Sequence, residues 1–374
     1  MNQKSDIWKK ITVMIFFLVL TGFGIAAVFL PDVTVSKAER RTLAQKPKLS
    51  IETVQNGSYM EKLETYLLEQ FAGREFFRTL KAETETTVFG KSDSNGYYQV
   101  GDSVYKLDEQ LNEKNIVHAA EAFSRVKSEL FPEAEAYYAV IPDKNYFVAE
   151  ENGYPSYDYG RLQELMQNEM KDILYIDIYH LLELEDYYRT DLHWKQECIV
   201  DVAEELLSQM SEKIQVSADK AAYTRQTAVS DFSGGYAGAS AFAVEPEEMH
   251  YLTDDTLERA IVYDYETKQE TTIYQKDKLE GMDAYDFFLG GARALITIQN
   301  PDNQNGKKLL VFRDSFGSSI APLFLEKYEE ITLVDFRYIS EKTLPEVLDT
   351  AGYDNVLFLY STTVLNHSDS MKIN

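Results

Sequence analysis

The sequence predicts an α/β protein in which a mostly parallel β-sheet is covered by helices on both faces. Short apolar segments of the kind found in buried strands recur along the chain, as at 134–142 and 308–312. Between such segments lie stretches with apolar residues at helical spacing, as at 109–130 and 195–211. This alternation is typical of parallel sheets, because each parallel pair of strands needs a crossover connection that packs on one face of the sheet.

The composition indicates a folded chain that is able to bury one large core, or a core and a smaller satellite. Of the 374 residues, 44% are hydrophobic and 13% are aromatic. A formal charge of −25 disfavours nucleic acid or an anionic membrane surface as a partner of the domain as a whole, and its simplest role is solubility outside the cell. The single cysteine, Cys198, excludes an intrachain disulfide and a thiol-rich metal site.

Residues 11–30 predict a transmembrane helix. Their sequence, ITVMIFFLVLTGFGIAAVFL, is twenty uncharged and mostly apolar residues long, which is about the length that an α-helix needs to cross the hydrocarbon core. Lysines precede the run, so the positive-inside bias places residues 1–10 in the cytoplasm and everything after Pro31 outside. A cleaved signal peptide is the alternative. The length of the run and the lack of a convincing cleavage site favour an uncleaved anchor.

The rest of the chain divides into two parts. Residues 31–106 predict a linker, a helical arm and a hairpin, the hairpin being signalled by Asn95-Gly96. Residues 107–374 predict the extracytoplasmic α/β domain. Within it, residues 220–300 break the alternation with glycine-rich and hairpin-like segments, which indicates a small β-rich insertion.

Ser315 stands at the joint between a buried strand and a helix, in KLLVFRDSFGSSIAPLF. In sheets of this kind the working residues lie just past the carboxyl ends of the strands. Unpaired N–H groups at a helix amino terminus also favour developing negative charge. Ser315 is therefore a candidate nucleophile, and a simple helix cap is the alternative. Its neighbour Asp314 is expected to be a structural cap or turn residue.

Asp191 and His193 lie two residues apart in the segment YYRTDLHWKQE. An extended Asp-x-His stretch lets both side chains project to the same side, so the carboxylate is able to orient a histidine that acts as a base. With Ser315 they would form a triad in the chain order Asp, His, Ser. The alternatives are a helix cap at Asp191 and a packed pair at His193-Trp194.

No metal site or cofactor is predicted. Four further histidines lack partners at metal-ligand spacing: His118, His180, His250 and His367.

The pairing of RTDLHW with the later LLVFRDSFGSSIAPLF and ITLVDFRYI resembles the DHHW family of membrane-anchored bacterial proteins. These are similar to the SGNH-like O-acetyltransferases of the alginate-modifying machinery. The resemblance covers most of the chain beyond the anchor and implies an SGNH-hydrolase-like three-layer α/β/α fold, permuted so that Asp-x-His precedes the serine. It implies Ser315 as nucleophile, His193 as general base and Asp191 as its orienting partner. The family motif reads Asp-His-His-Trp, and Leu192 replaces its first histidine.

The resemblance implies acyl transfer in two steps, in which Ser315 takes an acetyl group from a donor and a sugar hydroxyl then accepts it. The expected function is O-acetylation of a cell-surface or secreted polysaccharide, with a multipass membrane partner that supplies acetyl groups. An acetyl esterase would use the same triad with water as acceptor, because the choice depends on how well the site excludes water. A non-catalytic glycan-binding or assembly protein is the third alternative.

Four further residues are candidates for oxyanion or substrate binding, beside the Ser315 N–H. Gly290 and Gly291 are able to bring backbone N–H groups close to a ligand, and a plain turn is the alternative. Arg337 follows a predicted strand and is able to hold an acetyl oxygen or a sugar acid, with a salt bridge to Asp335 as the alternative. Lys144, after AVIPD, is a weaker candidate of the same kind.

Overall fold

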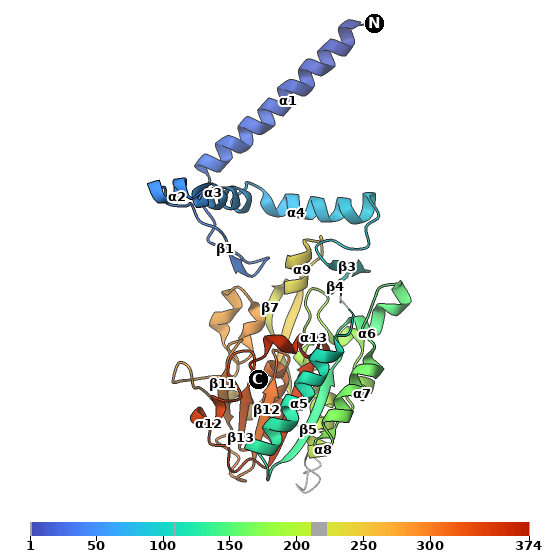
Figure 1. Cartoon of the computed structure of the whole chain (residues 1–374), viewed down its shortest axis with the longest axis vertical. Helices are drawn as coiled ribbons and strands as arrows, with labels where there is room; N and C mark the ends of the chain where they lie inside the picture. Colours follow the sequence, from blue (N-terminus) through green and yellow to red (C-terminus); the bar gives the residue numbers. More distant parts are fainter. Residues whose placement is uncertain (1, 108–109, 211–222, 374) are drawn as a thin grey trace.

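A computed structural model describes residues 2–107, 110–210 and 223–373 of the chain. It consists of a long amino-terminal helix, a layer of helices that runs crosswise to it, and an α/β domain (Figure 1).

The described residues of the α/β domain build an eight-stranded sheet. In spatial order its strands are β10 (Gln269–Thr271), β9 (Ile261–Asp264), β11 (Leu295–Gln299), β13 (Glu330–Val334), β12 (Lys308–Arg313), β14 (Asn355–Ser361), β5 (Glu135–Ile141) and β6 (Leu174–Tyr175). The strands from β13 to β6 are parallel, and the other three add antiparallel strands at one edge. The predicted α/β fold with a mostly parallel sheet is confirmed.

The central strands are apolar along their whole length because both faces of the sheet are covered. In β14, Leu357 and Leu359 pack into one core, whereas Val356, Phe358 and Tyr360 pack into the other. This alternation follows from the two-residue period of a strand. The sheet therefore separates two hydrophobic cores.

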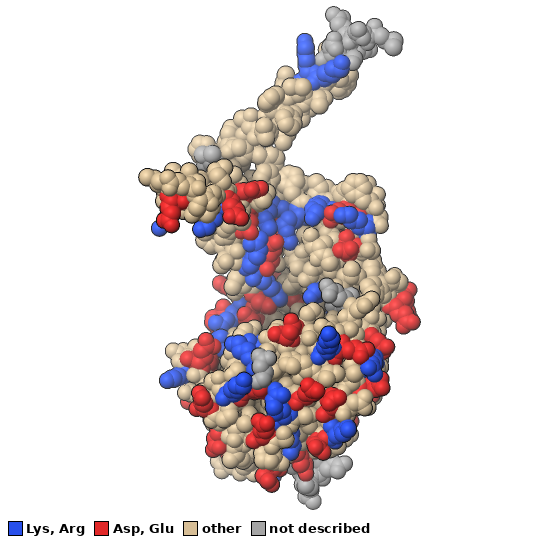
Figure 2. All heavy atoms as spheres, viewed as in Figure 1, with Lys and Arg blue, Asp and Glu red and all other residues tan. Residues whose placement is uncertain are grey.

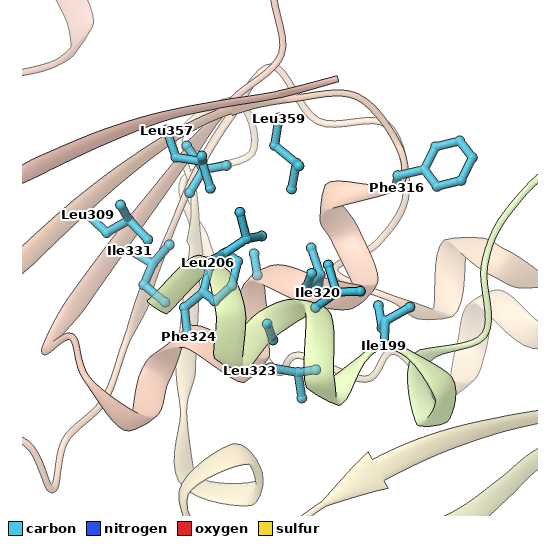
Figure 3. Packing of buried hydrophobic residues seen from close by; sticks show 14 of the residues in the cluster. Ile199, Leu206, Leu309, Phe316, Ile320, Leu323, Phe324, Ile331, Leu357 and Leu359 are labelled. Atoms are coloured by element: carbon cyan, nitrogen blue, oxygen red, sulfur yellow. The ribbon is translucent and has the colours of Figure 1, made fainter. Parts of the chain in front are cut away.

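Helices cover each face of the sheet. One core lies under α5 (Glu113–Leu130) and α7 (Tyr159–Glu169). The other lies under α8 (Val200–Met210), α11 (Gly317–Ile320) and the 3₁₀ helix η8 (Ala321–Glu326). Figure 3 shows this second core, where strand side chains such as Leu309 and Leu357 point toward Leu206 and Phe324 of the covering helices.

The segment 220–300, of which residues 220–222 lie outside the described residues, divides into two parts. Strands β7 (Thr224–Phe232) and β8 (Glu247–Thr253) form a separate antiparallel ribbon that carries α9 (Gly235–Ser240) between them. Strands β9 to β11 instead extend the central sheet. The second part of the expected insertion is therefore integral to the sheet.

The amino-terminal part begins with α1 (Asn2–Phe29). Within it, Ile7–Ala27 is long and apolar enough to cross a membrane by length and composition. The chain continues through the short hairpin β1 (Val35–Ser36) and β2 (Arg41–Thr42) to α2 (Ile51–Gln55), α3 (Ser58–Glu69), α4 (Arg74–Glu83) and the π-helical turn η1 (Thr84–Val88). The predicted apolar helix is present, is the one such helix among the described residues, and fits a single-pass anchor.

The expected hairpin is β3 (Tyr97–Val100) paired with β4 (Ser103–Lys106). Its connecting turn lies at 101–102, not at Asn95-Gly96. Those two residues, with φ of 54° and 79°, make a separate tight turn between Ser94 and Tyr97, whose backbones exchange two hydrogen bonds. Asn95-Gly96 is therefore a two-residue turn, as its sequence predicts, but this turn precedes β3 and does not connect β3 to β4.

Candidate active site

Asp191, His193 and Ser315 lie in one hydrogen-bonded chain. His193 Nε2 lies 2.8 Å from Ser315 Oγ, and His193 Nδ1 lies 2.6 Å from Asp191 Oδ1. Because the carboxylate only accepts, Nδ1–H donates to it and Nε2 is left to accept the serine hydroxyl proton. Asp191 and His193 are buried and Ser315 is partly exposed, so the hydroxyl is the accessible end of the chain. This is the arrangement of a serine nucleophile with a base and an orienting acid.

A tight loop holds Asp191 and His193 in this position. Tyr187 and Trp194 form an antiparallel bridge, and the Tyr188 N–H donates to the His193 carbonyl oxygen at 3.0 Å. Asp191 Oδ1 also accepts the His193 backbone N–H at 3.1 Å. The 3₁₀ helix that follows starts after Lys195, so Asp191 is not its cap.

Lys144 stabilises the same loop through hydrogen bonds to its backbone. Its Nζ donates to the carbonyl oxygens of Tyr188, Arg189 and Asp191 at 2.8–3.1 Å and to that of Val104 at 2.7 Å. Burial lowers the pKa of Lys144 to about 7, against the raising effect of the Asp191 and Glu247 charges. The ammonium group of Lys144 thus binds backbone carbonyl oxygens and holds the loop in place, and a substrate-binding role for this residue stays a prediction.

The second carboxylate oxygen of Asp191, Oδ2, accepts hydrogen bonds from other residues. Oδ2 accepts the Gly235 N–H at 2.6 Å and an Arg40 Nη2–H at 2.9 Å. A Cβ added at Gly234 would overlap the Asp191 side chain, so only glycine allows this close approach. Burial would raise the pKa of Asp191, but the charges of Arg40 and His193, and hydrogen bonds from His193 and Gly235, hold it well below its usual range.

Aromatic rings fix the plane of the imidazole. Tyr285 stacks on His193 with ring centroids 3.8 Å apart and planes 7° apart, and Phe316 contacts the ring at 5.0 Å. The Tyr285 hydroxyl and Trp194 Nε1 both hydrogen-bond Ser319 Oγ at 2.8 Å. Sequence reasoning missed Tyr285 and Arg40, because neither lies near the triad residues in the chain.

The Ser315 turn is tied to the sheet by Asp314. Its Oδ1 accepts the Phe316 N–H at 3.0 Å, and its Oδ2 accepts the N–H and hydroxyl of Ser361 at 2.8 and 2.7 Å. Asp314 is thus the turn residue that the sequence predicts. Helix α11 has Phe316 as its N-cap, so Ser315 is not a helix cap. Among the described residues, no acceptor is recorded for the Ser315 N–H, which leaves it available as an oxyanion donor.

Gly290 and Gly291 belong to a turn. Both have positive φ, 76° and 79°, and side chains would collide with Gln275 at the first and Asp286 at the second. The Gly291 N–H donates to the Phe288 carbonyl oxygen at 3.3 Å. In the described part of the chain, no contact of either glycine with Ser315 is recorded. The two glycines therefore form the turn that the sequence offers as the alternative, and an oxyanion role for them stays a prediction.

Arg337 forms a salt bridge with Asp335. Its Nε and Nη2 donate to the two carboxylate oxygens of buried Asp335 at 3.0 and 2.7 Å, and Arg313 lies 3.9 Å from the same carboxylate. The salt bridge to Asp335, which the sequence offers as the alternative for Arg337, is present, and a substrate-binding role for Arg337 stays a prediction.

The family model of the DHHW proteins matches residues 160–334, a stretch that contains Asp191, His193 and Ser315. A search of curated proteins gave no match. Among solved structures, a DHHW family protein from Eubacterium siraeum is 21% identical, with a TM-score of 0.60 over 75% of this chain and 95% of that one.

Bacillus cereus PatB1 is similar in the same way. Its structure with a sulfonyl adduct has 17% sequence identity to this chain and a TM-score of 0.55, and the match covers 72% of this chain and 94% of PatB1. A second PatB1 structure gives 19% and 0.53, over 72% and 96%. At these identities the structural likeness shows a shared fold. Family model and fold agree, and the resemblance to the DHHW family that the sequence predicts is confirmed.

Proposed function

We propose that this protein is a membrane-anchored O-acetyltransferase that moves acetyl groups to hydroxyls of a cell-surface or secreted polysaccharide. The observation that carries the proposal is the contact of 2.8 Å between His193 Nε2 and Ser315 Oγ, with Asp191 behind the ring at 2.6 Å. The resemblance to the DHHW family supports it. The lysines that precede the apolar run 11–30 support an orientation in which the α/β domain lies outside the cytoplasm.

The proposed reaction has two halves. Ser315 Oγ attacks the acetyl carbonyl carbon while its proton passes to His193 Nε2, and the carbonyl oxygen becomes an oxyanion near the Ser315 N–H. The tetrahedral intermediate collapses, the donor's leaving group takes the proton from His193, and acetyl-Ser315 remains. A sugar hydroxyl then attacks this ester, its proton passes to His193, and collapse returns the proton to Ser315 Oγ. Asp191 holds the Nδ1–H throughout.

An acetyl donor made in the cytoplasm has to reach a site outside it. We therefore include a multipass membrane partner that passes acetyl groups across the bilayer in the proposal. No residue of this chain is assigned to that partner.

The test is to incubate the full chain in detergent with p-nitrophenyl acetate and to follow the mass of the Ser315 peptide. We expect a gain of one acetyl group, and a fall in its rate of formation of about 10³-fold or more in Ser315→Ala and His193→Ala. Acetylation of an added oligosaccharide supports transfer, whereas free acetate alone indicates an esterase, an outcome favoured by the partial exposure of Ser315. Unacetylated Ser315 under all conditions would leave a non-catalytic protein.

A further inference from the structure

Helices α3 and α4 with the turn η1, residues 58–88, form a layer that we call the platform. It runs crosswise to α1 and lies between α1 and the α/β domain (Figure 1). One side of the platform carries exposed apolar side chains at helical spacing. Phe76, Leu80 and Val88 share a helix face and are 66%, 49% and 71% exposed, and Leu67 and Phe71 continue the apolar surface onto the neighbouring part of the platform.

The other side of the platform is polar and occupied. Arg74 and Arg78 both pair with Glu39, at 2.8 and 3.4 Å, and Arg78 also donates to the Gly238 carbonyl oxygen at 2.9 Å. Ala82 is fully buried in a small core with Phe242. Figure 2 shows Lys, Arg, Asp and Glu gathered beneath the platform, while its surface on the side of α1 is largely free of them.

The apolar side is continuous with α1. The ring of Phe23, within the span Ile7–Ala27, stacks on Phe71 with centroids 4.8 Å apart and contacts Phe77 at 5.6 Å. The exposed face therefore begins where the apolar helix ends, which is the level at which a spanning helix leaves the bilayer.

Hydroxyl groups on this part of the platform are satisfied internally. Thr84 Oγ1 donates to the Leu80 carbonyl oxygen at 2.6 Å, and Thr87 Oγ1 donates to the Glu83 carbonyl oxygen. Such hydrogen bonds to the backbone of the same helix satisfy hydroxyl groups in surroundings where few water molecules are available.

We propose that the apolar face of the platform lies in the interfacial layer of the same membrane that α1 enters, with lipid as its occupant. A continuous exposed apolar face is costly in water and is typical of helices that lie in the membrane interface. The platform then fixes the height and tilt of the α/β domain above the bilayer. This inference rests on α1 as an anchor and does not depend on acetyl transfer.

The test uses two consecutive residues of α4 in the full chain, whose side chains leave the helix about 100° apart and so lie on different faces of it. Leu80→Cys and Lys81→Cys, each with Cys198→Ser, are spin-labelled in nanodiscs of phosphatidylethanolamine and phosphatidylglycerol. The Lys81 side chain is 60% exposed, so both sites accept a label. Collisions with oxygen and with a water-soluble nickel chelate are then measured by paramagnetic resonance.

The label at Leu80 is expected to collide several-fold more with oxygen than with the chelate, and the label at Lys81 to show the reverse. Equal access of the chelate to both labels would mean a water-exposed face. Protection of Leu80 from both reagents would mean a protein cover. Either result overturns the proposal.

A different observation concerns Arg40, in the β1–β2 hairpin that follows α1. Its guanidinium donates to Asp191 Oδ2 at 2.9 Å and to Asp283 Oδ2 at 2.5 Å, and its side chain is 17% exposed. The hairpin is docked closely, because a Cβ added at Gly238 would overlap the Ala38 carbonyl oxygen and one at Gly235 would lie 2.9 Å from the Arg40 guanidinium.

We infer that Arg40 is a positioning residue for the triad, an inference that rests on the proposed function. By binding Oδ2, it leaves Oδ1 of Asp191 to orient His193, and it supplies a countercharge to a buried carboxylate. The juxtamembrane hairpin thereby completes the active site of the domain.

The test compares Arg40→Met and Arg40→Lys with Arg41→Met, whose guanidinium pairs with Glu69 outside the site. For Arg40→Met, kcat for acylation is expected to fall about 10- to 100-fold with little change in KM, in the range typical of a misoriented catalytic group. Arg40→Lys is expected to recover part of the loss. Arg41→Met is expected to keep the rate of the unaltered protein.

The acidic limb of the pH–rate profile in Arg40→Met is expected to move to higher pH, because the His193 imidazolium loses a repelling charge. Asp191 and the stacked Tyr285 are the titratable groups in direct contact with the ring, Asp283 shares the Arg40 guanidinium with Asp191, and Lys144 and Glu247 bind the backbone of the same loop. A pH limb and kcat equal to those of the unaltered protein would overturn the positioning role.

A readout without turnover separates this inference from the proposed function. The low-field proton resonance of His193 Nδ1 is expected to shift in Arg40→Met and not in Arg41→Met. If Ser315 is never acetylated but the resonance shifts, the proposed function fails while the positioning of the Asp–His pair by Arg40 stands. An unshifted resonance in Arg40→Met would refute the positioning role of Arg40.

Discussion

Asp314 and Ser361 join the carboxyl ends of two neighbouring strands, β12 and β14, through two hydrogen bonds to one carboxylate oxygen, 2.8 Å from the Ser361 nitrogen and 2.7 Å from its hydroxyl. Ser315 follows Asp314 directly, so these bonds fix the position of Ser315 relative to the ends of the two strands. Asp143 lies two residues after the end of the neighbouring strand β5, and its Oδ2 accepts the hydroxyl of Thr362, the residue after Ser361, at 2.6 Å. A buried polar network therefore spans three strand ends beneath the triad.

Replacing Asp314 by alanine is expected to lower the free energy of unfolding by about 2–4 kcal/mol, because buried N–H groups of Phe316 and Ser361 lose their acceptor. Urea denaturation measures the change. Asp349→Ala is the control, since this exposed carboxylate accepts one N–H at 3.0 Å in a surface turn. Equal losses for the two variants would contradict the role given to Asp314.

Tyr285 is expected to act on catalysis through its ring. Tyr285→Phe keeps the stack on His193 and loses the hydrogen bond to Ser319, which costs about 1 kcal/mol of stability and little activity. Tyr285→Leu removes the stacked ring, and we expect acylation of Ser315 to slow about 10-fold or more as the imidazole loses its fixed plane. Burst kinetics with an activated acetyl ester measure both. Equal activity of the two variants would mean that the stack does not orient His193.

Arg337 is expected to be structural. In Arg337→Ala the buried Asp335 carboxylate keeps only the longer contact with Arg313, and the free energy of unfolding falls by about 3 kcal/mol. The acylation rate per folded molecule stays unchanged, and so does KM for the acceptor. A selective rise in KM without loss of stability would instead restore the substrate-binding role.

Asp286 is expected to make the stability of the protein depend on pH. Burial, with a further contribution from the Asp283 charge, raises the pKa of Asp286 to about 6 from an ordinary 3.8. A raised folded-state pKa in an acid means that stability from this group is present below about pH 4 and is lost as pH rises toward 6. Asp286→Asn is therefore expected to gain stability relative to the unaltered protein over this window and to hold a constant gain above pH 7. Thermal unfolding across pH 4–8 measures it, and a gain that is flat with pH would refute the assignment.

Gly238→Ala is expected to undock the β1–β2 hairpin, because the new Cβ would overlap the Ala38 carbonyl oxygen. We expect trypsin to cut the hairpin at Lys37 or Arg41 about 10-fold faster, as local opening exposes it, while the α/β core stays resistant. Gly160→Ala is the control, since its nearest atom would lie at an ordinary 3.5 Å. Unchanged cleavage would mean that the hairpin tolerates the clash.

Ser315 was predictable as a site residue because it follows a buried strand, where polar groups of parallel sheets commonly lie, and Asp191 and His193 were predictable from their Asp-x-His spacing. The position after a strand also selects Lys144 and Arg337, whose side chains bind backbone carbonyl oxygens and Asp335, respectively. It identifies the edge of the sheet but cannot identify the acceptor that a charged side chain finds there.

Arg40 lies 151 residues from Asp191 in the chain, and no local pattern announces such a contact. Strands β9 to β11 were recognised as strands within the segment 220–300, but their partners were not. Local alternation reports that a segment is extended, whereas its position in a sheet depends on packing between distant segments.

The position of β14 has a consequence for biogenesis. This strand follows every other strand of the sheet along the chain, yet it lies between β12 and β5 and is the link between the earliest strands, β5 and β6, and the later ones. A chain that is exported from its amino terminus cannot close the sheet until β14 has emerged. Folding is then governed by a late, long-range pairing, so we expect a domain that still lacks β14 to expose apolar strand edges and to depend on chaperones until this strand is in place.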